Sequence, residues 1–132
     1  AMEEGHLDAA RYHYAKGLEL ADEARDPWMS ARILYCAGRT ELHGGSPQQA
    51  LKLFQLGTVS ARRSPLLTSV LEANSAWATA ELGRPDLARR SIERAQEAHA
   101  SVDFDRDTPM FRWFGEPELA SLIGAVQVAR HD

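Results

Sequence analysis

The residues of this sequence best able to do chemistry are its histidines, its clustered aspartates and its single cysteine. The histidines are His6, His13, His43, His99 and His131. They are scattered, and no two are four positions apart, so their spacing does not predict the converging ligands that zinc requires. Cys36 lies in an apolar stretch, where we expect a small buried residue that is not a reactive thiol. We therefore expect no metal site from these residues.

Three aspartates near the C-terminus, Asp103, Asp105 and Asp107, resemble the opening of a calcium-binding loop. Such a loop needs glycine at its sixth position and glutamate at its twelfth, where this sequence has Thr108 and Phe114. We therefore expect an aromatic-rich loop at 103–116 without calcium. Its aromatic residues would fold back over an apolar helix face; they are Phe104, Phe111, Trp113 and Phe114.

Neither the motifs nor the charge of the chain indicate catalysis or nucleic-acid binding. The sequence lacks a glycine-rich phosphate loop, a nucleophile elbow and a zinc-protease motif, so we expect no enzyme and no cofactor. Its net charge of -4 argues against contact with nucleic acid, and the pair Arg62-Arg63 is too small to form a basic patch. Short apolar runs, the lack of a secretory signal and a lone cysteine predict a cytoplasmic protein without a membrane span.

Three stretches share one spacing of small and large residues, which predicts repeated helices. They are 5–17, 45–57 and 83–95, and they begin 40 and 38 positions apart. Each has glycine, then alanine five positions on, a large residue four later, and glycine or alanine three after that. The small positions would let a neighbouring helix approach closely while the large residue fills the groove between helices. Periods of this length are typical of helical repeat proteins.

Further apolar periodicity predicts helices at 28–42 and 65–82, with prolines at their first turns and glycines after their ends. A further helix is expected between these two, and Ser46 and Gln49 have the spacing of a capping box at its start. We expect a single all-α domain of about six antiparallel helices and no sheet. It would comprise a half repeat at 5–26, repeats at 31–64 and 69–102, the loop, and a half repeat at 117–130.

This pattern resembles the tetratricopeptide repeat, a helix-turn-helix unit of about 34 residues. The matching positions in the first full unit are Gly38, Gly45, Ala50, Phe54 and Gly57. Those in the second are Ala76, Gly83, Ala88, Ile92 and Ala95. The resemblance implies a short right-handed superhelix in which the first helix of each unit lines a concave surface. Glu41, Glu72 and Thr79 depart from the pattern, because the family prefers bulky residues there.

The arginine- and alanine-rich repeats and the segment at 113–124 also resemble the C-terminal repeat domains of bacterial helix-turn-helix transcriptional regulators. That resemblance implies a part that senses or dimerises, while another domain contacts DNA. We expect a protein- or peptide-binding interaction module. Two other functions remain open: a sensor of a small signalling peptide or metabolite, and a self-association domain that forms a homodimer through its terminal helices.

The register of the repeat family implies which side chains face the concave surface. In the first unit they are Arg32, Tyr35, Arg39 and His43; in the second they are Val70, Ala73, Asn74, Trp77 and Glu81. Guanidinium groups beside aromatic rings would suit an acidic segment or a peptide carboxylate. Alternatively, Tyr35 and Trp77 belong to the core between helices, and the two arginines are solvated or pair with Glu41 or Glu81. The lysine and asparagine pair of chaperone-binding members is lacking, so we expect no chaperone tail as ligand.

Overall fold

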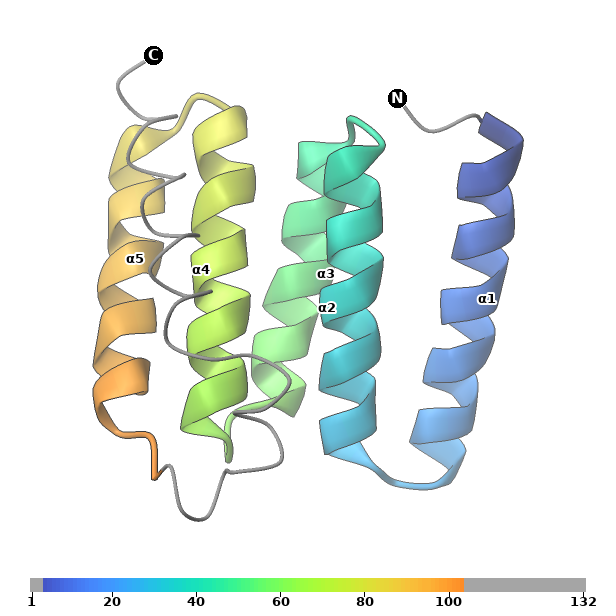
Figure 1. The fold of residues 1–132 in the computed structure, drawn as a ribbon, viewed down its shortest axis with the longest axis horizontal. Coiled ribbons are helices and arrows are strands. Elements are labelled where there is room, and N and C mark those ends of the chain that lie inside the picture. The colour runs from blue at the N-terminus through green and yellow to red at the C-terminus, as the bar shows by residue number, and fades with distance from the viewer. Residues whose placement is uncertain (1–3, 104–132) are drawn as a thin grey trace.

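A computed structural model describes residues 4–103 of the chain, and this part is built from five α-helices. They are α1 (Glu4–Glu23), α2 (Pro27–His43), α3 (Pro47–Ser60), α4 (Pro65–Glu81) and α5 (Pro85–Ala100). Consecutive helices run antiparallel and pack as neighbours (Figure 1). Residues 4–103 contain no strand, which confirms the all-α expectation. Five helices are found where about six were expected; the helix expected at 117–130, and the loop at 103–116 apart from Asp103, lie outside the described residues.

Proline starts α2 to α5, and small polar side chains cap α2 and α4. Pro27, Pro47, Pro65 and Pro85 each occupy the first turn, where a missing backbone N–H costs nothing. Ser64 accepts a hydrogen bond from the Leu67 backbone nitrogen at 3.2 Å, as an N-cap should.

The capping box expected at the start of α3 is wrong. Ser46 is the N-cap residue, but its side chain makes no capping hydrogen bond. Its backbone N–H donates to the carbonyl oxygen of Glu41 at 2.8 Å. The N–H that Gln49 would have to accept is therefore already occupied by the preceding helix.

Glycines permit the tight turns between helices at two positions. Gly45 has φ +85° and Gly83 has φ +75°, in the left-handed region that an L side chain rarely adopts. Both were expected from the sequence to end helices in this way, and the structure confirms it. Arg25 adopts the same region, with φ 54°, in the turn from α1 to α2.

The expected pairing of small and large residues builds the core between α2 and α3. Phe54 is fully buried, and a Cβ atom on Gly38 would lie 2.6 Å from Cδ1 of its ring. Only glycine at 38 leaves room for this ring. In the hairpin of α4 and α5, Ala76 and Ile92 pack in one cluster. The helix stripes predicted around Phe54 and Ile92 are thus confirmed as buried.

Helix α4 is the most buried of the five and lies between α3 and α5 (Figure 1). It brings Leu66, Leu67 and Leu71 to the main core cluster. None of the helices within residues 4–103 combines the length and the apolar character that crossing a lipid bilayer requires.

Candidate functional site

Four of the nine residues expected to face the concave surface meet where α2 faces α4. The guanidinium carbon of Arg39 lies 4.9 Å from the centroid of the Trp77 ring. Nη1 of Arg39 donates to Oδ1 of Asn74 at 3.1 Å, and Nη2 lies 3.5 Å from Nε2 of His43. We call Arg39, His43, Asn74 and Trp77 the α2–α4 site.

Asn74 supports Arg39 from inside the protein. Its side chain is fully buried, and Nδ2 donates to the backbone carbonyl of Val70 at 2.8 Å. A carbonyl oxygen can only accept and a guanidinium group can only donate, so these two partners fix the orientation of the amide. Asn74 therefore holds Arg39 in place and does not itself offer a surface to a ligand.

Trp77 forms both a wall of the site and part of the core. It is half-buried and packs against the clusters that contain Val70 and Ile92. Its Nε1 donates to Oε1 of Glu81 at 3.3 Å. The charge of Arg39 rests against the ring, an arrangement that stabilises a cation by about 0.5–2 kcal/mol depending on its desolvation. Trp77 thus belongs partly to the core between the helices, as the alternative interpretation of the sequence expected.

A cavity of about 340 Å³ adjoins this site. Its lining residues are Leu42, His43, Gly45, Pro47, Trp77 and Glu81. The volume falls in the range of small-ligand sites, roughly 300–1,000 Å³. Leu42 and Pro47 were not predicted; they lie at the end of α2 and at the start of α3. Leu42 lies three positions after Arg39, a helical spacing that could have suggested it.

The other expected groove residues lie differently. Tyr35 is half-buried and packs with Trp77 against the cluster of Val70, Ala73 and Ala95. Val70 and Ala73 are themselves fully buried, so they belong to the core and not to an open groove. Arg32 is half-buried on α2, about two turns before Arg39.

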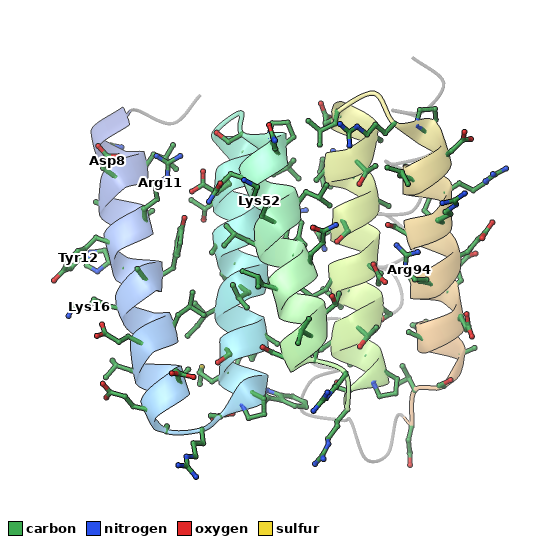
Figure 2. The ribbon with its side chains drawn as sticks, turned by 180° about the vertical axis from the view of Figure 1, so that it is seen from behind. Asp8, Arg11, Tyr12, Lys16, Lys52 and Arg94 are labelled. Atoms are coloured by element: carbon green, nitrogen blue, oxygen red, sulfur yellow. The ribbon has the colours of Figure 1, made fainter. Side chains whose placement is uncertain are left out.

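A second polar cluster joins α1 to α2. The Glu41 side chain is fully buried, and its two carboxylate oxygens accept from Nε and Nη2 of Arg11, each at 2.8 Å. The Tyr14 hydroxyl donates to Oε2 at 2.8 Å. Figure 2 shows Arg11 pointing from α1 toward α2, while Tyr12 and Lys16 point away. We call Arg11, Tyr14 and Glu41 the α1–α2 lock.

The sequence did not reveal the lock, although Glu41 stood out as a charge where the repeat family prefers a bulky residue. Its pairing with Arg39 or Arg32, weighed as an alternative, is wrong, because Arg11 of α1 takes both of its oxygens. The two partners are 30 positions apart, and their meeting depends on how α1 docks.

Two other side chains that departed from the family pattern also find partners: Glu72 accepts from Nε of Arg94 at 2.7 Å, and Thr79 donates to the Ser75 carbonyl.

The lock shifts the titration of its members. Hydrogen bonds from Arg11 hold the pKa of Glu41 below its ordinary value, against the opposing effect of burial. Burial, followed by the hydrogen bond to Glu41, raises the pKa of Tyr14 to about 12. The carboxylate is therefore ionised and the phenol neutral across the neutral pH range.

These shifts predict how the lock contributes to stability as pH changes. The folded Glu41 binds its proton less readily than the unfolded one, so its contribution is present above the ordinary carboxyl pKa of about 4.3. It is lost as pH falls through the lower folded pKa. Tyr14 has the opposite sign: its contribution is present below the ordinary pKa of about 10 and is lost as pH rises through about 12.

Urea unfolding of the wild type and of Glu41→Gln, measured from about pH 3 to pH 7, checks the acid limb. We expect the two free energies of unfolding to differ most at neutral pH and to converge as the solution becomes acidic. A difference that stays constant over this range would contradict the assignment. Glu19→Gln, which changes an exposed carboxylate on α1, is the control that should leave the profile unchanged.

Among residues 4–103, no group of three histidine, cysteine, aspartate or glutamate side chains is placed to hold a metal ion. Comparison of the chain with protein-family models, with curated proteins and with solved structures finds no match.

Proposed function

We propose that this chain is a non-catalytic interaction module that binds a peptide or a protein segment at the α2–α4 site. The observation that carries the proposal is the fixed position of Arg39, held between a tryptophan ring and a buried amide beside a cavity. A charged side chain that is immobilised before binding loses little conformational entropy when a ligand arrives.

The chemistry of the site suits a ligand with both a carboxylate and an apolar group. A guanidinium group has five N–H donors, of which Arg39 directs one to Asn74 and another toward His43. The remaining donors can bind a carboxylate in a forked arrangement. Leu42, Pro47 and the Trp77 ring form an apolar wall where a side chain could be buried.

The packing of the two hairpins supports a tetratricopeptide-like arrangement for the module. Gly38 with Phe54, and Ala76 with Ile92, place a small residue against a large one at corresponding points. We extend this to the right-handed superhelix and to the setting that the sequence suggested. In that setting the chain is the regulatory part of a bacterial transcriptional regulator, and it receives a partner while another domain contacts DNA.

Selection of peptides from a random display library, followed by fluorescence polarisation of the selected peptides, tests the proposal. Arg39→Ala and Trp77→Ala should each weaken binding by about tenfold, the loss of one well-placed contact. Arg90→Ala is the matched control, because Arg90 is exposed on α5 and should leave affinity unchanged. Selected peptides that bind both site variants as tightly as the wild type would refute a role for the α2–α4 site.

Self-association is a second candidate, favoured by apolar side chains left on the surface. Leu20 of α1 is 64% exposed and Val59 of α3 is 67% exposed. Light scattering during size-exclusion chromatography separates this candidate from the first: twice the chain mass would favour it, and a monomer at high concentration would exclude it.

The sensor function is favoured by a separate cavity between α1 and α2, of about 350 Å³. Its lining residues are Gly17, Leu20, Ala21, Ala24, Asp26, Met29 and Ile33. These are mostly apolar, so the cavity would suit a small apolar molecule more than a charged metabolite. A ligand seated there should stabilise the protein in a thermal-shift screen independently of Arg39.

A further inference from the structure

The cavity beside the α2–α4 site does not end at the turn between α2 and α3. Another cavity, of about 470 Å³, is lined by Gly45, Ser46, Pro47, Gln48, Gln49, Lys52 and Leu82. Gly45 and Pro47 line both cavities, so the two adjoin across this turn. We call the combined surface, from Trp77 to Lys52, the turn cleft.

Lys52 lines the turn cleft, and Arg39 lies beside it against the Trp77 ring. Arg39 lies four positions before the end of α2, and Lys52 lies five positions after the start of α3. Because α2 and α3 are antiparallel neighbours, the two cations lie at similar heights on either side of the turn. Lys52 lies on α3 in Figure 2, and its side chain is exposed.

Lys52 is one of several cations without an ion-pair partner in the described part of the chain, and Arg39 is another. Arg11, Lys16, Arg89 and Arg94 each have a carboxylate within 4 Å. Within residues 4–103, Lys52 has no such carboxylate. Glu81 is the single acidic residue lining the cleft, and its Oε1 accepts from the Trp77 ring. Lys52 in the lining and Arg39 beside it therefore give this surface two cations against one carboxylate, on a chain whose net charge is -4.

We propose that the turn cleft binds an extended, acidic segment of a partner protein. One carboxylate would pair with Arg39 and a second with Lys52, while an apolar side chain between them enters the cavity formed by Leu42, Pro47 and Trp77. The inference rests on the proposed function. It deepens that function by naming the chemistry of the partner segment and its course, from the α2–α4 site toward Lys52. Gln48 and Gln49 provide amide groups that can both donate to and accept from the backbone of such a segment.

Fluorescence polarisation with two synthetic peptide sets tests this inference. The first set places glutamates on both sides of a central leucine or tryptophan at varied spacings, and the second replaces every glutamate with glutamine. We expect the best acidic peptide to bind at least about tenfold more tightly than its amide counterpart, with affinity falling as salt rises.

Variants at the two lysines locate the second contact. Lys52→Ala should weaken binding of the acidic peptide about threefold, as expected for an exposed ion pair, and Lys52→Glu should weaken it further by repulsion. Lys16→Ala is the matched control, since Lys16 is the only other lysine and lies on α1. The amide peptide should bind Lys52→Ala and the wild type equally.

The outcomes separate this inference from the proposed function. One outcome is that binding is lost in Arg39→Ala and Trp77→Ala but is as tight in Lys52→Glu as in the wild type. This outcome would overturn the role of the turn cleft and leave that of the α2–α4 site in place. Peptides that bind Arg39→Ala, Trp77→Ala and Lys52→Glu without loss would overturn both. A failure of both peptide sets to bind the wild type would also overturn the inference, because it names their chemistry as sufficient.

Discussion

Phe54→Ala is expected to lower the free energy of unfolding by about 3–5 kcal/mol, the usual effect of removing a buried phenylalanine ring. The ring is fully buried and belongs to the cluster that unites α2, α3 and α4. Gly38 directly beneath it has no side chain with which to fill the resulting space. Urea denaturation followed by circular dichroism measures the change.

Two comparisons sharpen this prediction. Leu56→Ala lies on the same helix but alters a side chain that is 58% exposed, so its effect should stay within about 0.5 kcal/mol. Gly38→Ala should destabilise the wild type because the new methyl group meets the ring. It should cost much less in Phe54→Ala, where the ring is gone. Strictly additive effects of the two substitutions would show that Gly38 and Phe54 are not packed as described.

The sequence predicted the parts of the fold that depend on nearby residues. Proline restricts its own backbone and glycine permits positive φ, so Pro47 and Gly45 mark the ends of helices without reference to the rest of the chain. The spacing of Ala50 and Phe54 likewise defines one helix face. The cap at Ser46 failed because its backbone N–H bonds to Glu41, whose position depends on the preceding turn.

The candidate site was predictable to a similar extent. A helical register is enough to place Arg39 and His43 on one face of α2, and a second register places Asn74 and Trp77 on α4. The register does not predict how far each side chain is buried, and Asn74 proves to be a buried support for Arg39. Nor can it reveal the turn cleft, since cavities depend on how turns and helix ends pack together.

The second large effect is expected at the α1–α2 lock, where Glu41→Ala should lower the free energy of unfolding by about 2–4 kcal/mol. The substitution leaves a void and deprives the Tyr14 hydroxyl of its acceptor. Arg11 is 43% exposed and can turn toward water, so the loss should be smaller than if a fully buried cation were stranded. Urea denaturation gives the total change.

Amide hydrogen exchange then shows where the stability is lost. Helix α1 packs on α2. Tyr14 and Leu18 of α1 contact the cluster of Leu34, Ala37 and Leu53. The docking of α1 therefore depends on the lock and on this modest apolar contact. We expect Glu41→Ala to reduce protection in α1 far more than in α5. Glu19→Ala is the control, since its exposed pair with Lys16 contributes little. Equal loss of protection in α1 and α5 would mean that Glu41 supports the whole fold and that the first helix has no separate lock.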